Sequence, residues 1–289
     1  MKKNRLIILL LIANIFNLSC LKDPNHFDER GYAAIHLAVK SGDIDEVREL
    51  IEDGADVNRV AQDKNKSHPL FFAIMSKNIN MVKLLVENKA NVNYQDEGGA
   101  TPLMWASWSK QDEIVEYLLK NNANPNFVDY TGYSAIYTQS LKGIYLLAKY
   151  GARVDVRNQK GKTPKEEFKE IDGGPFLWEV LTAKDIKETV SLRNENRQTP
   201  LHLAIMNKAD WLAEILIEAG SNVNAVNKYG DTPLHYAVRN ENLDAVKKLV
   251  EKGADINVKD ANGSALICYA VLSEKNIPVL EYLIQKGAQ

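Results

Sequence analysis

The chain has 289 residues, with 36 Lys and Arg against 38 Asp and Glu, so it is close to electrically neutral. This balance excludes the strongly basic surface that nucleic-acid binding requires. The hydrophobic share of 45% and the charged share of 26% are typical of a folded globular chain rather than a disordered one. The only two cysteines, Cys20 and Cys268, exclude a fold held together by disulfides.

The N-terminus carries the pattern of an export signal. Three basic residues precede the apolar run 6–16, which is too short to span a bilayer but has the length of the apolar core of a signal peptide. Residues 1–19 are therefore predicted to be a signal peptide. The following Cys20 resembles the cysteine of a bacterial lipoprotein cleavage box, which implies lipid attachment there. Asn17 stands where that box usually has Leu, so export without a lipid stays open.

The rest of the chain repeats one pattern, which is clearest at 227–257. Gly230 is expected in a turn, and Thr232 followed by Pro233 is typical of a helix N-terminus. A second apolar-periodic helix then ends at Gly253, in the position of a C-terminal cap. One such unit is a turn and two short helices, which cannot bury its apolar face alone.

Equivalents of Thr232 recur at intervals averaging about 33 residues. They are Ala33, His68, Thr101, Ser134, Thr163, Thr199, Thr232 and Ala265. The segments TPLHLA (199–204) and TPLHYA (232–237) carry the pattern in full. The chain therefore resembles the ankyrin-repeat family, which implies an all-α solenoid of about eight helix-turn-helix units with short hairpin loops.

The repeats predict how the chain is divided. We expect a tether at 20–27, repeats one to four at 28–157, a degenerate repeat five at 158–192, and repeats six to eight at 193–289. Repeat four is short by about one helical turn, which would keep its helix faces in register. Repeat five is either a drifted repeat or a hinge. Repeat eight is expected to close the array as a terminal cap.

No catalytic motif stands out, and the histidines have structural explanations. His36, His202 and His235 lie in the T-P-L-H position, which the resemblance implies is a hydrogen-bonding position inside the repeat. His68 replaces a helix-capping threonine, and Cys268 takes the histidine position of repeat eight, where it is expected to be buried. The sequence therefore predicts no catalytic residue, no metal and no cofactor.

The resemblance also implies where a partner would bind, namely at the hairpin tips and the concave face made by the first helix of each repeat. Exposed aromatic residues and arginine at such positions favour binding hot spots. Trp108, Tyr130 and Tyr133 are expected to be exposed, whereas Trp105 either is exposed or packs against the neighbouring repeat. The predicted partner-binding residues are Met75, Trp105, Trp108, Tyr130, Tyr133, Tyr229 and Arg239.

These observations predict a non-enzymatic protein–protein interaction module of the bacterial cell envelope. It is expected to bind no nucleic acid and no small-molecule substrate. It would be monomeric, attached to the membrane through lipidated Cys20, and its partner would be a protein, including an envelope enzyme or toxin that it regulates. A surface lipoprotein that contacts host molecules is one alternative. An enzyme with an unrecognised site in repeat five is the other.

Overall fold

The computed structural model describes residues 23–168 and 173–289, so the predicted signal peptide and Cys20 lie outside the described residues. The chain divides into two compact units, residues 1–167 and 168–289, and the boundary falls inside the predicted repeat five. In the part that the structure describes, no helix is long and apolar enough to cross a membrane.

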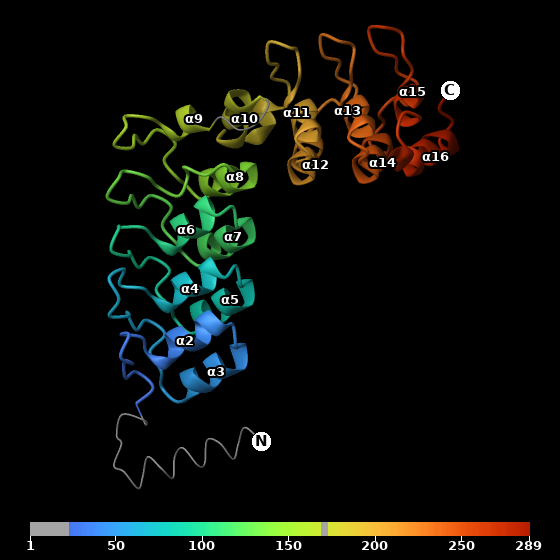
Figure 1. Ribbon diagram of the computed structural model, residues 1–289. Coiled ribbons are helices and arrows are strands. Elements are labelled where there is room, and N and C mark those ends of the chain that lie inside the picture. Colours follow the sequence, from blue (N-terminus) through green and yellow to red (C-terminus); the bar gives the residue numbers. More distant parts are fainter. Residues whose placement is uncertain (1–22, 169–172) are drawn as a thin grey trace, which may run out of the picture. The chain divides into compact units, whose positions relative to one another are not determined.

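Unit one consists of helix pairs that stack in chain order. Its helices are α2 (Ala34–Ser41), α3 (Ile44–Glu52), α4 (Pro69–Met75), α5 (Ile79–Glu87), α6 (Pro102–Trp108), α7 (Asp112–Lys120), α8 (Leu141–Lys149) and α9 (Pro164–Glu167). The first helices α2, α4 and α6 contact one another in turn, and each also packs on its own second helix. The hairpin loops of this unit project from the same side of the stack (Figure 1).

Unit two continues the same pattern. Its helices are α10 (Gly174–Leu181), the 3-10 helix η2 (Ile186–Thr189), α11 (Pro200–Met206), α12 (Asp210–Glu218), α13 (Pro233–Arg239), α14 (Leu243–Glu251), α15 (Leu266–Ala270), the 3-10 helix η3 (Glu274–Asn276) and α16 (Ile277–Gln285). Within the described residues 23–168 and 173–289, the only β-structure is two isolated bridges, in the first and last hairpin loops. The predicted all-α solenoid is confirmed.

The histidines of the T-P-L-H position are built into the repeat, as predicted. The backbone N–H of Thr199 donates to His202 Nδ1 at 3.1 Å, so the ring proton is on Nε2. His202 Nε2 in turn lies 3.1 Å from the carbonyl of Asp231 in the next repeat. His202 is fully buried, and each of its ring nitrogens has a backbone partner. The ring therefore joins the start of one helix to the following hairpin loop.

A series of asparagines joins consecutive repeats through the loops that follow their second helices. Asn93 Nδ2 donates to the carbonyl of Asn122 at 3.1 Å, and Asn93 Oδ1 accepts the N–H of Asn124 at 2.8 Å. The same pair of bonds connects Asn58, Asn126 and Asn224 to their next repeats. We name these residues the asparagine ladder.

The first member of this ladder lies in the predicted tether. Asn25 Nδ2 donates to Gly54 O at 3.1 Å and Asn25 Oδ1 accepts from the N–H of Asp56 at 2.7 Å, as in the repeats. The guanidinium of Arg59 lies 4.2 Å from the ring centre of Phe27. Residues 23–27 thus pack on repeat one instead of hanging free from it.

Repeat four departs from the expectation, because it lacks its whole first helix rather than one turn. Residues 134–140 form turns, and α8 is the second helix of the repeat. Ser140 caps α8 by accepting the N–H of Gly143 at 3.1 Å, so this glycine is inside the helix and not in an interhelical turn. The five residues between Ser134 and Ser140 are too few for both a helix and a turn, because a helix needs several bonds to repay its nucleation.

The last repeat also differs from the expectation. Cys268 is exposed, so the prediction that it is a buried small residue was wrong. The histidines at the same position in repeats one and six instead reach a carbonyl of the next hairpin loop. Large apolar side chains are exposed here as well, which a polar terminal cap would not show. They are Val271, Leu272, Ile277 and Ile284.

Candidate protein-binding surface

The side of unit one made by the hairpin loops and by α2, α4 and α6 carries most of the predicted binding residues. We call it the first-helix face (Figure 1). Met75 ends α4, and Trp105 and Trp108 belong to α6. Tyr130 and Tyr133 lie in the hairpin loop between α7 and α8. The structure therefore brings five of the seven predicted residues to the same face of neighbouring repeats.

One hollow opens between the hairpin tips of repeats two and three, with a volume of about 230 Å³. Its lining includes Ser67, Phe71, Met75, Asp96, Glu97 and Trp105. We call it the Trp105 hollow. Met75 is 62% exposed and Trp105 36% exposed at its mouth. The rings of Phe71 and Trp105 meet edge to face, with their centres 6.5 Å apart. Trp105 therefore combines the two alternatives: its ring packs on Phe71 of the neighbouring repeat, and part of it is exposed.

Two carboxylates border the Trp105 hollow. The indole N–H of Trp105 donates to Asp96 Oδ2 at 2.9 Å, which fixes the ring. Asp96 Oδ1 accepts the backbone N–H groups of Gly98 and Ala100, which hold the hairpin tip. The carboxylate of Glu97 lies 2.7 Å from Lys66 Nζ, and the hydrogen bond between them raises the pKa of Lys66. The apolar hollow thus has an acidic edge.

A second hollow, of about 350 Å³, lies beside Trp108, Asp129, Tyr133 and Tyr137. Trp108 and Tyr133 are only half-exposed, unlike the prediction for them. The indole N–H of Trp108 donates to Ser134 O at 3.1 Å, and the hydroxyl of Tyr133 donates to Glu167 Oε1 at 3.2 Å. Both side chains therefore also hold repeats together, whereas Tyr130 is 72% exposed as expected.

The two predicted residues of unit two behave differently from each other. Tyr229 is 51% exposed at a hairpin tip. Arg239 instead pairs with Asp231 through two hydrogen bonds of 2.8 Å, and its guanidinium lies 4.2 Å from the ring centre of Tyr269. Arg239 is therefore engaged inside the chain, and it could reach a partner only by breaking these contacts.

Sequence reasoning missed Phe71, Asp96 and Tyr137 as parts of the two hollows. Phe71 takes the T-P-L-H histidine position of repeat two, and this replacement of a polar ring by an apolar one was the available signal. Asp96 fixes Trp105 from nine residues away, across a loop. That contact depends on the folded hairpin, so no local pattern reveals it.

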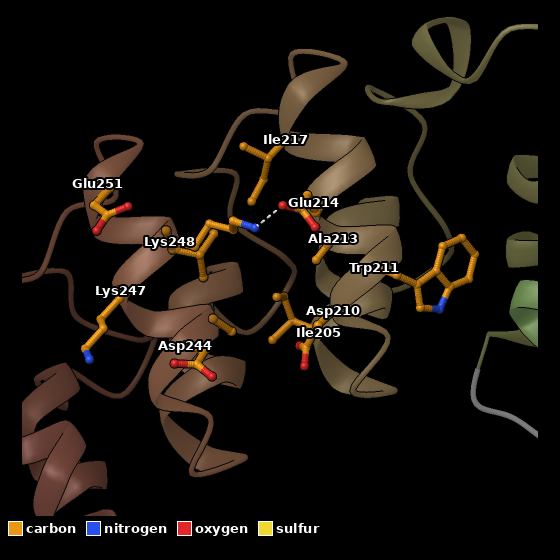
Figure 2. A pocket seen from close by; sticks show the side chains of 12 residues that line it. Ile205, Asp210, Trp211, Ala213, Glu214, Ile217, Asp244, Lys247, Lys248 and Glu251 are labelled. Atoms are coloured by element: carbon orange, nitrogen blue, oxygen red, sulfur yellow. Dashed lines mark hydrogen bonds and ion pairs between the residues drawn. The ribbon is translucent and has the colours of Figure 1, made fainter. Parts of the chain in front are cut away.

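Another groove, lined by α12 and α14 in unit two, is a consequence of helix spacing. Its floor is apolar, and its edges carry charged side chains, with Lys248 hydrogen-bonded to Glu214 across it (Figure 2). An equivalent groove recurs between α3 and α5 of unit one, lined in part by Ile44 and Leu84. Because a similar groove lies between second helices in both units, we do not assign it a specific ligand.

Over residues 23–168 and 173–289, no group of three or more His, Cys, Asp and Glu side chains could hold a metal ion. The buried histidines His68 and His202 have their pKa lowered to about 4, mainly because burial disfavours the charged ring. Such rings are neutral near pH 7 and serve as hydrogen-bonding groups.

Comparison with known protein families agrees with this architecture. The model for ankyrin repeats in three copies matches residues 35–129, 176–260 and 227–289, which together make up more than half of the chain. The chain belongs to the ankyrin-repeat family. Ankyrin repeats indicate a protein–protein interaction module, and such domains are generally non-enzymatic.

The ankyrin repeats of this chain are similar to those of several curated proteins. It is 24% identical over 225 residues to transient receptor potential cation channel subfamily A member 1 of Homo sapiens, covering 75% of this chain and 17% of that protein. It is 41% identical over 69 residues to the B-cell lymphoma 3 protein homolog of Mus musculus, covering 24% and 15% respectively.

A third relative is the putative ankyrin repeat protein L371 of Acanthamoeba polyphaga mimivirus, 32% identical over 99 residues, which cover 34% of this chain and 12% of that protein. The matches thus span less than a fifth of the length of each of these three relatives. What they share with this chain is the repeat architecture rather than a common activity.

Proposed function

We propose that the chain is a protein-interaction module of the bacterial cell envelope, which binds its partner through the first-helix face of unit one. The observation that carries this proposal is the exposure of Met75, Trp105 and Tyr130 on consecutive repeats of this face, with Met75 and Trp105 lining an apolar hollow. Exposed aromatic side chains that share one face favour a binding site over incidental exposure. The partner is a protein, including an envelope enzyme or toxin whose activity it regulates.

The envelope location rests on the sequence of the N-terminus. The basic start, the apolar run 6–16 and Cys20 support export followed by lipid attachment. A single cysteine at that position would carry the anchor. Because residues 23–27 pack on repeat one, only a few residues would separate the lipid from the array, which would hold the repeats near the membrane surface.

Replacing Trp105 and Tyr130 together by alanine is expected to weaken partner capture by about thirty-fold or more. Truncating a hot-spot aromatic residue costs about 2 kcal/mol or more of binding free energy. The measurement is capture from a detergent extract of the cell envelope by the full chain, compared with the double variant. Far-ultraviolet circular dichroism should stay unchanged, because both side chains are exposed.

Tyr150→Ala supplies the matched control, since Tyr150 is an exposed aromatic residue at the end of α8. It should capture the partner as the unsubstituted chain does. Equal capture by the Trp105→Ala/Tyr130→Ala variant would contradict the proposed surface.

Cys20→Ser is expected to abolish lipid attachment and to release the protein from the membrane fraction. The serine hydroxyl cannot form the thioether that carries the lipid in bacterial lipoproteins. Incorporation of an alkyne-labelled fatty acid into the full chain measures this directly, with Cys268→Ser as the control that keeps the label. Labelling that persists in Cys20→Ser, or that is absent from the unsubstituted chain, would contradict the anchor.

A further inference from the structure

The Trp105 hollow belongs to a niche that recurs between neighbouring repeats. Each niche combines the residue seven positions after the first-helix cap of one repeat with two residues of the next repeat. In that next repeat, one residue stands four positions after the first-helix cap, and the other stands five positions before the same cap. In the Trp105 hollow they are Met75, Trp105 and Asp96, counted from the helix caps His68 and Thr101.

Repeats seven and eight show what this niche accepts, because an arginine of the chain fills it. Arg239, Tyr269 and Asp260 take the three positions there. The guanidinium of Arg239 lies 4.2 Å from the ring centre of Tyr269, and the Tyr269 hydroxyl is hydrogen-bonded to Asp260 Oδ2. A positive group thus lies against an aromatic ring that Asp260 holds in place, and it is also paired with Asp231, whose counterpart in the Trp105 hollow is Ser67.

The niche between repeats one and two also contains a cation of the chain, in this case a lysine. Lys40 Nζ lies 5.9 Å from the ring centre of Phe72, and Asp63 takes the acidic position. Two niches of this chain therefore contain a cation supplied by the chain itself. In each, the cation comes from the end of a first helix and the ring from the next repeat.

The Trp105 hollow has the ring and the carboxylate of the niche but a neutral residue in place of the cation. Trp105 donates its indole N–H to Asp96 Oδ2, just as Tyr269 bonds Asp260. Met75 takes the position of Arg239 and Lys40, and its thioether carries no charge. Glu97 adds a second carboxylate at the edge, although Lys66 pairs with it.

The niche of repeats six and seven is a useful contrast. Asn227 takes the acidic position there, and both Asn227 and Gln198 donate to the hydroxyl of Tyr236 at 3.0 Å. Its aromatic residue is held by neutral amides, and Met206 takes the cation position. A methionine alone therefore does not make the site, because that niche lacks the carboxylate that the Trp105 hollow retains.

We propose that the Trp105 hollow binds an arginine or lysine side chain of the partner protein, in the place that Arg239 fills from within the chain in repeats seven and eight. This inference rests on the proposed function. The volume of about 230 Å³ suits one side chain, since sites for whole small molecules typically measure about 300–1,000 Å³. The positive end lies against the Trp105 ring and near Asp96, while Met75 and Phe71 cover the aliphatic stem.

The test compares N-acetyl-arginine amide with N-acetyl-citrulline amide, which has nearly the same shape but no charge. Each is titrated into the ¹⁵N-labelled full chain in mild detergent, and the indole N–H signal of Trp105 is followed by NMR after assignment with Trp105→Phe. The arginine probe is expected to bind roughly three to ten times more tightly than the citrulline probe, the ratio that a cation–π contact gives.

Two variants make the result specific. Met75→Arg is expected to fill the hollow as Arg239 does in its own niche, and so to abolish binding of the arginine probe. It should remain folded because Met75 is exposed. Asp96→Asn removes the charge while its one side-chain oxygen can still accept the N–H groups of the hairpin tip, at the loss of the bond from Trp105, and is expected to bring arginine binding down to the level of citrulline.

Equal binding of the two probes, no response of the Trp105 signal to either, or undiminished arginine binding by Met75→Arg would each overturn the inference. These outcomes are distinguishable from failure of the proposed function. A chain that loses its partner in the Trp105→Ala/Tyr130→Ala variant, yet does not prefer arginine to citrulline, keeps the proposed surface and loses only the basic side chain as its ligand.

Discussion

Lowering the pH from 7 to 4.5 is expected to reduce the free energy of unfolding by several kcal/mol, through four buried histidines. These are His36, His68, His202 and His235. Burial lowers the pKa of each, to about 4 for His68 and His202, against an ordinary value of 6.5. Below pH 6.5 the unfolded chain therefore binds more protons than the folded chain.

Stability from these histidines is complete well above pH 6.5 and is lost progressively as the pH falls through their lowered pKa values, which are about 4 for His68 and His202. Each of His68 and His202 contributes roughly 2–3 kcal/mol over this range, at 1.36 kcal/mol per pKa unit. Folding also lowers the pKa of Asp63 below its ordinary value of 3.8, so the stability from that carboxylate is lost only as the pH falls below about 4.

Urea unfolding at a series of pH values between 7 and 4.5 measures this loss. His68→Thr is the matched variant, because threonine caps the same helix position at Thr101, and the substitution removes one buried ring that titrates. It should flatten the pH dependence of unit one by roughly 2–3 kcal/mol. Stability that stays constant from pH 7 to 4.5, or a His68→Thr variant with an unchanged slope, would contradict the account.

Replacing Asn93 of the asparagine ladder by alanine is expected to cost about 1–3 kcal/mol and to broaden the unfolding transition of unit one. The variant loses the bond to the carbonyl of Asn122 and the bond from the N–H of Asn124, which both cross between repeats. A solenoid is held together by contacts between neighbours, so a weaker interface separates the unfolding of repeats one and two from that of repeats three and four.

Urea-induced unfolding followed by circular dichroism measures both the midpoint and the steepness of the transition. Asn80→Ala is the control, because Asn80 is exposed on α5 and outside the ladder. It should change stability by no more than about 0.5 kcal/mol, as surface substitutions usually do. If Asn93→Ala unfolds as Asn80→Ala does, the ladder does not couple the repeats.

The features that follow from local sequence were predictable. Thr199 followed by Pro200 is sufficient to begin a helix, and the recurrence of this pair at about 33 residues indicates the stacking. The structural role of His202 follows from its place in the same motif, since its partner Thr199 is three residues away. These signals act within one helical turn, so a single repeat is enough to recognise them.

The features that depend on a neighbouring repeat were not predictable. Whether Cys268 is buried depends on a loop that would have to pack over it from the next repeat. The difference in exposure between Trp105 and Trp108 depends on which loop lies beside each ring, because Trp108 reaches the carbonyl of Ser134 and Trp105 does not. Burial of individual side chains on a solenoid is set between repeats, whereas sequence patterns describe what happens within them.

The first-helix face of unit one is the centre of this account, and hydrogen–deuterium exchange of the full chain with its captured partner tests it most directly. Binding is predicted to slow amide exchange in α4, α6 and the hairpin loops around Asp96 and Tyr130, and to leave the α12–α14 groove of Figure 2 unchanged. Slower exchange confined to the second helices, or to unit two, would contradict the assignment of the binding surface.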